Sequence, residues 1–258
     1  MIKLFQVLFL CHTVQIDNQA KERYQASSPD EFSFIKFCAK LGIVYEGEDK
    51  DPDSSAMIRK ILFQNRVLEY KMLQVLEFDT TRKRMSVIVE DMQTHEIILL
   101  CKGAETSIFP RCTKGNVEQC REDIDKFARK GWRTLVISFK YLSKVEYQNI
   151  EDKLSEALSD VTNRNENLSR QFDTIESSLE LIGATAVEDK LQENVADTLE
   201  SLRQAGIKIW VLTGDKTETA LNVSYSCKHF SNEMHIISCV DLKTPEEAAL
   251  KLESIKRQ

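Results

Sequence analysis

The chain has 258 residues, of which 42% are hydrophobic and 29% are charged, so it can bury one large core or two modest ones, and disorder is not expected over most of its length. The formal net charge is -6 and the longest basic run is residues 82 to 84, which argues against a nucleic-acid partner. Seven cysteines without a Cys-x-x-Cys pair indicate reduced thiols in a cytosolic setting rather than disulfides or a zinc site, and we assign no metal ligands.

The first apolar stretch, residues 4 to 10, predicts a buried helix. It is far shorter than the roughly 20 residues that span a bilayer, and no small-residue cleavage site of a signal peptide follows it. No other stretch is apolar enough to cross a membrane, so we expect the chain itself to be soluble.

Extended segments dominate the next part of the chain. β-Branched residues and two-residue periodicity predict strands at 71 to 78, 84 to 90, 95 to 101 and 133 to 140, and residues 91 to 94 suit a hairpin turn. Ser28 and Pro29 are typical of a helix start, and residues 115 to 131 predict a helix that ends at Gly131. A long polar helix is expected at 144 to 178. The pattern favours an α+β domain, with helices on an antiparallel sheet, over residues 1 to 182.

From about residue 180 the pattern changes to alternating strands and helices, which favours a partial α/β domain with a parallel sheet over residues 183 to 258. Leu191, Val195, Leu199 and Leu202 form a helical stripe that ends at Gly206, and residues 207 to 212 predict a buried strand. Thr213, Gly214 and Asp215 then stand where such a strand meets the next helix, a position that suits phosphate binding, although a plain strand-to-helix turn explains them equally well. Residues 240 to 258 predict an amphipathic helix after a Thr-Pro start.

Six motifs occur in one order along the chain: "SPDE", "LEFDTTRKRMSVIV", "CKGAE", "RTL", "GATAVEDKLQ" and "IWVLTGDKTETA". Together they resemble the phospholipid-transporting, or flippase, branch of the P-type ATPases. The resemblance implies that residues 1 to 182 are the nucleotide-binding (N) domain. It also implies that residues 183 to 258 are part of the phosphorylation (P) domain, which has a haloacid-dehalogenase-like fold.

The segment "GDKTET" is close to the Asp-Lys-Thr-Gly-Thr at which that family forms its aspartyl-phosphate. The resemblance nevertheless implies that Asp215 is not the nucleophile, because the phosphorylated aspartate of the family precedes the nucleotide-binding domain. A carboxylate at Glu218 would also repel the phosphoryl group. We therefore assign no catalytic residue, and the family's Gly-Asp-Gly-x-Asn-Asp run, which holds Mg²⁺, does not occur in this sequence.

The same resemblance implies an ATP site. Phe78 matches the aromatic on which adenine stacks, Lys102 the lysine at the base of the pocket, and Glu31 a carboxylate that accepts from the adenine amino group. From the residues alone, the plainer interpretations are a core aromatic for Phe78, a solvated surface lysine for Lys102 and the first turn of a capped helix for Glu31. The remaining ATP contacts implied by the resemblance are Thr80, Lys83, Arg133, Thr134, Thr213, Gly214 and Asp215. Asp189 matches a hinge between the two domains, and an exposed turn is its plainer interpretation.

By this resemblance, the chain is the ATP-binding cytoplasmic portion of a membrane pump that moves phospholipid, with an aminophospholipid favoured, from the outer to the inner leaflet. The chain alone is expected to be inactive, and the pump's membrane and actuator parts, an accessory subunit and most Mg²⁺ ligands are expected elsewhere. Two alternatives stay open. A haloacid-dehalogenase-like phosphatase would need an N-terminal Asp-x-Asp strand that this sequence does not show. A stand-alone nucleotide-binding or regulatory protein would need none of the missing parts.

Overall fold

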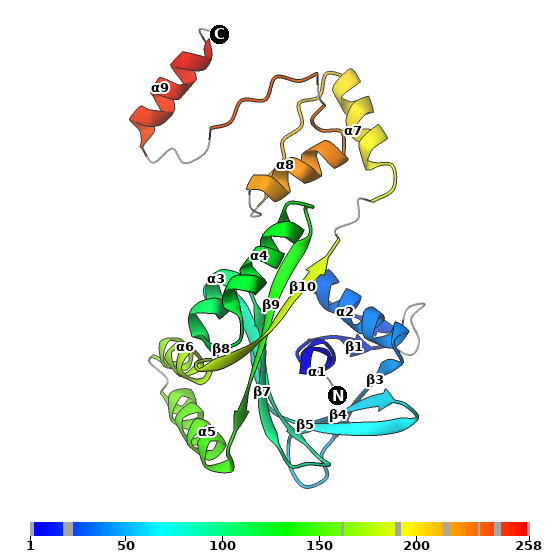
Figure 1. Cartoon of the computed structure of the whole chain (residues 1–258), viewed down its shortest axis with the longest axis vertical. Coiled ribbons are helices and arrows are strands. Elements are labelled where there is room, and N and C mark those ends of the chain that lie inside the picture. The colour runs from blue at the N-terminus through cyan, green and yellow to red at the C-terminus, as the bar shows by residue number, and fades with distance from the viewer. Residues whose placement is uncertain are drawn as a thin grey trace. The chain divides into compact units, whose positions relative to one another are not determined.

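The computed structural model describes residues 3–17, 23–160, 163–188, 192–213, 217–231, 233–239 and 244–256. The chain divides into two compact units, Met1–Asp189 and Lys190–Gln258. Figure 1 shows the elements of both. No helix in the described part of the chain is long and apolar enough to cross a membrane.

An eight-stranded sheet forms the centre of the first unit, in the order β3-β4-β5-β6-β7-β9-β10-β8. All neighbouring strands are antiparallel except the parallel pair β10 and β8. The strands are β3 (Ile43–Lys50), β4 (Met57–Phe63), β5 (Arg66–Asp79), β6 (Arg84–Asp91), β7 (Ile97–Gly103), β8 (Cys112–Lys114), β9 (Arg133–Leu142) and β10 (Leu179–Val187). Two short strands, β1 (Gln15–Ile16) and β2 (Tyr24–Gln25), pair separately.

The four strands predicted from periodicity are confirmed as β5, β6, β7 and β9. The predicted hairpin joins β6 to β7, and Asp91 organises its turn by accepting hydrogen bonds from the backbone N–H groups of Gln93 and Thr94 at 2.9 and 3.2 Å. His95 completes the turn in the left-handed region, with φ of 57°. The α+β part of the fold prediction is therefore correct.

Helices cover both faces of this sheet (Figure 1). On one face, α1 (Lys3–Leu10) and α2 (Pro29–Lys40) pack against the strands in a cluster that includes Phe9, Ile35, Met85 and Leu100. On the other face lie α3 (Glu105–Ile108), the 3₁₀ turn η1 (Phe109–Arg111), α4 (Val117–Ala128), α5 (Lys144–Ser159) and α6 (Arg164–Ile175). Their cluster includes Leu76, Ile124, Leu154 and Ile175. The predicted buried helix at residues 4 to 10 is thus confirmed as α1.

The polar segment at 144 to 178 forms two helices, so the prediction of one long helix was wrong. Asp160 leaves the helical region, with φ of -79° and ψ of 98°. Its carboxylate accepts from the N–H of Asn163 at 3.1 Å and from the side chain of Asn167 at 2.8 Å. An Asp side chain that bonds nearby donors in this way offers the backbone an alternative to the helix.

Strand β10 belongs to the first unit, which therefore extends past residue 182. The expectation that this segment opens a parallel sheet in the second domain was wrong, because all seven registered positions of β10 on β9 are antiparallel, from Glu180 opposite Phe139 to Val187 opposite Arg133. The direction in which a strand pairs depends on its partner strand, which lies far away in the sequence, so the apolar run alone does not predict it.

The second unit contains α7 (Val195–Gln204), α8 (Thr217–Ser226) and α9 (Pro245–Lys256). α7 ends before Gly206, whose φ of 80° fits the predicted glycine stop. Residues 207 to 212 do not form the predicted strand; Trp210 is 83% and Leu212 is 91% exposed. A buried parallel strand needs neighbours on its edges, and the described residues of this unit form no strand. The haloacid-dehalogenase-like fold is therefore not seen in this unit.

Candidate functional site

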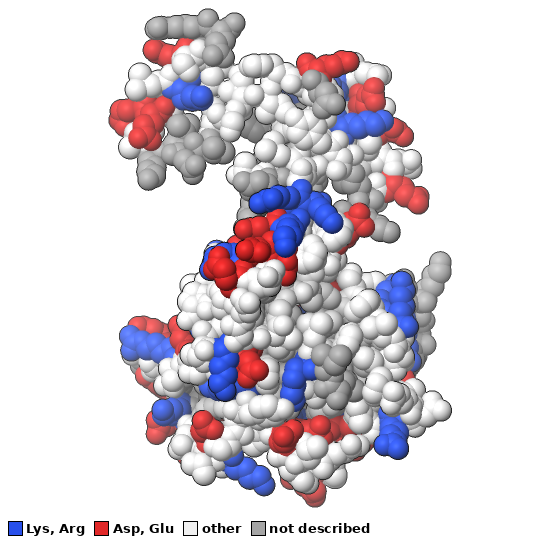
Figure 2. All heavy atoms as spheres, viewed as in Figure 1, with Lys and Arg blue, Asp and Glu red and all other residues white. Residues whose placement is uncertain are grey.

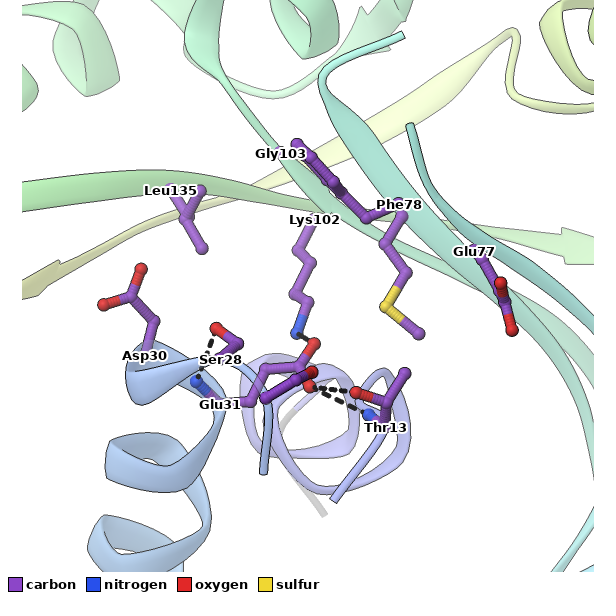
Figure 3. Close-up of a pocket in the computed structure, with 11 residues that line it drawn as sticks. Thr13, Ser28, Asp30, Glu31, Glu77, Phe78, Lys102, Gly103 and Leu135 are labelled. Atoms are coloured by element: carbon purple, nitrogen blue, oxygen red, sulfur yellow. Dashed lines mark hydrogen bonds and ion pairs between the residues drawn. The ribbon is translucent and has the colours of Figure 1, made fainter. Parts of the chain in front are cut away.

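A cleft of about 610 Å³ opens on the face of the sheet that α1 and α2 cover (Figure 3). It lies among β5, β6, β7, β9 and the start of α2. The residues that line it are Thr13, Ser27, Ser28, Asp30, Glu31, Glu77, Phe78, Met85, Lys102, Gly103 and Leu135. Three of the predicted site residues, Glu31, Phe78 and Lys102, are therefore brought together in one cavity although they are far apart in the sequence.

Glu31 sits in the first turn of α2, where Ser28 caps the helix by accepting from the Glu31 N–H at 3.4 Å. Its side chain turns into the cleft and is only 8% exposed. One carboxylate oxygen, Oε2, accepts from the backbone N–H and from the hydroxyl of Thr13, both at 2.9 Å. The helix cap and the cleft position thus coexist in the same residue.

Lys102 is the cation opposite this carboxylate. Its Nζ donates to Glu31 Oε1 at 2.7 Å, and its side chain is 6% exposed. Burial works to raise the pKa of Glu31, but the charge of Lys102 and the hydrogen bonds from Lys102 and Thr13 outweigh it, so that pKa lies below its ordinary value. Lys102 is therefore a buried partner of Glu31 and not a solvated surface lysine.

Gly103 follows Lys102 at a point where no larger residue fits. A Cβ at this position would lie 2.5 Å from Cβ of Arg84 and 2.6 Å from the backbone oxygen of Lys83. Glycine lets β7 approach the end of β6 closely, and this brings Lys102 to the base of the cleft.

Phe78 lies near the end of β5 and is 61% exposed, in contrast to a core aromatic. In Figure 3 its ring lies at the wall of the cleft above the Glu31–Lys102 pair. An exposed aromatic face beside a buried, charged pair suits a ligand that has a flat ring with polar atoms at its edge.

Those of the remaining predicted ATP contacts that the structure describes do not line the cleft. Thr80 and Lys83 are exposed in the turn between β5 and β6, where Lys83 has φ of 53°. Arg133 is exposed and Thr134 half-buried at the start of β9, and Thr213 is exposed in the second unit. None of these five lines the cleft as it is formed by the described residues. Gly214, Asp215 and the predicted hinge Asp189 lie outside the described residues.

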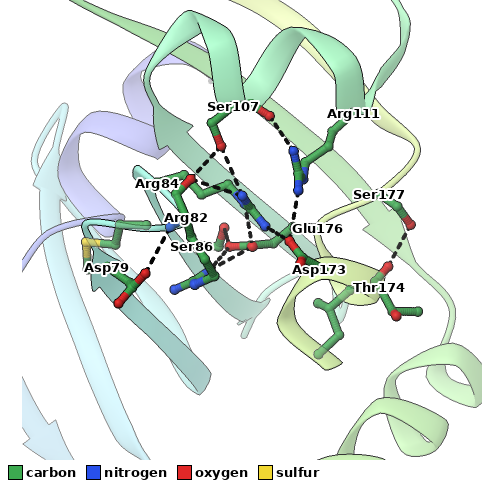
Figure 4. Close-up of polar contacts among 12 residues, drawn as sticks. Asp79, Arg82, Arg84, Ser86, Ser107, Arg111, Asp173, Thr174, Glu176 and Ser177 are labelled. Atoms are coloured by element: carbon green, nitrogen blue, oxygen red, sulfur yellow. Dashed lines mark hydrogen bonds and ion pairs between the residues drawn. The ribbon is translucent and has the colours of Figure 1, made fainter. Parts of the chain in front are cut away.

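Sequence reasoning missed Thr13, which lies between α1 and β1 and donates to Glu31, 18 residues further along the chain. It also missed a buried ionic cluster behind β6, in which Arg82 and Arg84 meet Glu176 (Figure 4). Both arginines of the basic run at 82 to 84 are buried. β6 offers no alternation that could have revealed this, because its six consecutive positions from Arg84 to Val89 are all buried. On the face shown in Figure 2, basic side chains lie beside acidic ones and form no broad basic surface.

No group of three or more His, Cys, Asp or Glu side chains that could hold a metal ion occurs in the described part of the chain. In the cleft, the Glu31 carboxylate is already paired with Lys102. These residues do not fit a Mg²⁺ site, and we derive no step through that ion.

The first unit is thus a mixed α+β domain with a largely antiparallel sheet, and its cleft holds an exposed aromatic ring near a buried ion pair. Residues 1–194 match the family described as "P-type ATPase, cytoplasmic domain N". The chain therefore belongs to the P-type ATPases, and the family expected from the six motifs is confirmed.

The similar proteins carry a consistent name. Phospholipid-transporting ATPase IH of Homo sapiens is 40% identical over 257 residues, which cover 95% of this chain and 22% of that protein. Phospholipid-transporting ATPase 11C of Mus musculus is 39% identical, with the same two coverages, and probable phospholipid-transporting ATPase 12 of Arabidopsis thaliana is 39% identical over 95% of this chain and 21% of its own length. The chain thus spans about a fifth of the length of these relatives.

Proposed function

We propose that this chain is the ATP-binding portion of an ATP-driven phospholipid transporter. The observation that carries the proposal is the exposed ring of Phe78 at the wall of a cleft whose base is the buried Glu31–Lys102 pair. The family match over residues 1–194 supports the same function.

Adenine fits this cleft chemically. Its faces can stack on Phe78, since every base has a π-face and stacking on an aromatic side chain contributes about 1 to 3 kcal/mol. Its amino group can donate to Glu31. A carboxylate has about four acceptor sites; Oε2 accepts two hydrogen bonds and Oε1 accepts one from Lys102, so Oε1 keeps acceptor capacity for a ligand.

The phosphates would leave the cleft toward groups that suit anions. Arg133 offers a guanidinium that stays charged, and Lys83, Thr80 and Thr134 offer further donors. Thr213, Gly214 and Asp215 of the second unit complete the proposed set at the phosphate end, and Asp189 is proposed as the hinge between the two domains. Mg²⁺ would be bound mostly by residues of the longer protein.

In the whole protein, we propose that ATP held here delivers its γ-phosphate to an aspartate that this sequence does not contain, and that the phosphorylation cycle moves phospholipid from the outer to the inner leaflet. The names of the relatives support phospholipid as the transported substrate. Membrane and actuator parts of the same pump, and an accessory subunit, are the proposed partners.

ATP titration of Phe78→Ala tests the site. Loss of stacking should weaken ATP binding by roughly one to two orders of magnitude. NMR chemical shifts recorded during the titration measure the affinity. Thermal stability should change little, because the ring is 61% exposed.

Phe37→Ala is the matched control. Phe37 is 49% exposed on α2 and does not line the cleft, so this variant should bind ATP as the unchanged chain does. A folded Phe78→Ala chain with unchanged ATP affinity would remove the adenine site from this cleft.

A further inference from the structure

The strand that carries Phe78 contains an extra residue just where Phe78 occurs. Leu76 of β5 pairs with Ser86 of β6, and Asp79 pairs with Arg84. Two residues of β5, Glu77 and Phe78, therefore lie opposite the single residue Met85 of β6. This arrangement is a β-bulge, a feature that re-aims side chains next to functional sites.

The bulge changes the face on which Phe78 lies. Side chains alternate between the two faces of a regular strand, so Phe78 would share the face of Leu76. Leu76 packs in the cluster beneath α3 to α6. Phe78 instead lines the cleft with Met85, which belongs to the cluster beneath α1 and α2. The ring reaches the cleft because of the extra residue.

A bulge leaves a backbone group without its ladder partner, and here a side chain supplies one. Arg82 donates from Nη2 to the backbone oxygen of Glu77 at 2.5 Å. The guanidinium is itself held, since Nη1 donates to both oxygens of Glu176 at 2.8 and 2.7 Å and the group lies 4.8 Å from the centre of the Phe172 ring.

Glu176 follows α6 directly and is completely buried. It also accepts from Arg84 Nε and from Ser86 Oγ, each at 2.6 Å (Figure 4). Arg82 is thus held on the helix-covered side of the sheet by Glu176. It holds in turn the backbone oxygen of Glu77 in the bulge, and the bulge directs Phe78 into the cleft on the opposite side.

We infer that Arg82 is a positioning residue for the ATP site: held by Glu176, it pins the bulge at Glu77 and Phe78 and so keeps the adenine-stacking ring turned into the cleft. The inference rests on the proposed adenine site at Phe78. It adds a residue that lies across the sheet from the cleft and does not line it.

Arg82→Lys is the test. A lysine keeps the charge beside Glu176 but lacks the planar fork that reaches two acceptors at once. In phenylalanine-labelled protein, the ring signals of Phe78, assigned by their loss in Phe78→Ala, should shift without any nucleotide present. ATP binding should weaken roughly 3- to 10-fold, because a site needs its contact groups held within about half an ångström.

Arg111→Lys is the matched control. Arg111 belongs to the same cluster, donating to Asp173 and to the backbone oxygen of Ser107 at 2.8 Å each, and it has no bond to the bulge. Its variant should leave the Phe78 ring signals and the ATP affinity unchanged within about 2-fold, whatever it does to stability.

A double-mutant cycle separates positioning from a general structural role. In the Phe78→Ala background, Arg82→Lys should weaken ATP binding by less than about 2-fold, because the ring that it positions is absent. An equal loss in both backgrounds, or unmoved ring signals in Arg82→Lys, would overturn the inference.

Two further outcomes are distinguishable. If Arg82→Lys shows no urea unfolding transition, Arg82→Gln takes its place, since Glu176 then retains Arg84 as its cation. If the unchanged chain does not bind ATP, the proposed function fails, whereas the ring signals of Phe78 still decide whether Arg82 holds the bulge.

Discussion

Glu31 takes part both in the cap of a helix and in the cleft. Its backbone N–H completes the cap of α2, while its carboxylate is held by Thr13 and Lys102 inside the cleft. The cap could be recognised from Ser28 and Pro29, which are adjacent in the sequence. The ion pair joins residues 71 positions apart, and only the pairing of β7 with its neighbours brings Lys102 there.

Glu31→Gln should reveal this ion pair through the pH dependence of stability. The folded-state pKa of Glu31 lies below the ordinary value of 4.5, so the carboxylate stabilises the fold above that pH, and this contribution is lost as the pH falls through the folded-state pKa. Near pH 7 the variant should lose on the order of 3 kcal/mol, because Lys102 is left buried without its partner.

Urea unfolding at several pH values between 7 and 3 measures this effect. The difference in unfolding free energy between the unchanged chain and Glu31→Gln should shrink as the pH falls below about 4.5, because Glu31 of the unfolded chain takes up a proton there before Glu31 of the folded protein does. A difference that stays constant over this range would mean that the negative charge of Glu31 does not stabilise the fold.

At the scale of elements, α5 in the polar segment after β9 has a buried face that its charged composition does not reveal. α5 begins with a capping box, in which Ser143 and Glu146 satisfy each other's backbone N–H groups. Most of its surface is polar, yet Leu154 and Ala157 are buried three positions apart on one face. Leu154 places α5 in the apolar cluster that α6 and the sheet share, and so narrow a stripe is easily overlooked in a charged sequence.

Leu154→Ala should therefore destabilise the first unit by about 2 to 5 kcal/mol, as expected for a buried leucine that leaves a cavity. Leu158→Ala, in the same helix at a position that is 47% exposed, should cost no more than about 0.5 kcal/mol. Urea unfolding of the two variants makes the comparison, and equal losses would contradict the assignment of the buried face.

At the scale of the whole molecule, the proposed ATP site and the groups that would transfer the γ-phosphate belong to different parts of the longer protein. Glu31, Phe78 and Lys102 all belong to the first unit. The sequence contains no Asp-Lys-Thr-Gly-Thr, and Asp215 is followed by Lys-Thr-Glu. Positioning and charge neutralisation dominate phosphoryl transfer, and most groups that would supply them are expected in other parts of the longer protein.

The isolated chain should consequently show ATP hydrolysis no higher than background and form no acid-stable phosphoenzyme. Incubation with γ-labelled ATP, acid precipitation and counting of retained label measure this directly, with a full-length phospholipid-transporting ATPase as the positive control. Label retained on Asp215 would show that this residue is a nucleophile after all.

Local sequence determined much of the first unit. Four strands, the turn after β6, the start of α2 and the end of α4 near Gly131 follow from periodicity and from cap residues, because these signals are carried by neighbours in the chain. The six motifs also identified the family, and they selected the three residues that the fold brings together in the cleft.

Tertiary structure alone decided the rest, because the deciding contacts join distant residues. β10 pairs with β9 rather than opening a second sheet, and residues 207 to 212 form no strand where no described neighbour pairs with them. The side of the sheet that Phe78 faces depends on a bulge whose backbone is held by Arg82, which is held in turn by Glu176, 94 residues further along the chain. A regular alternation of side chains, which is what a sequence pattern expresses, predicts the opposite face for that ring.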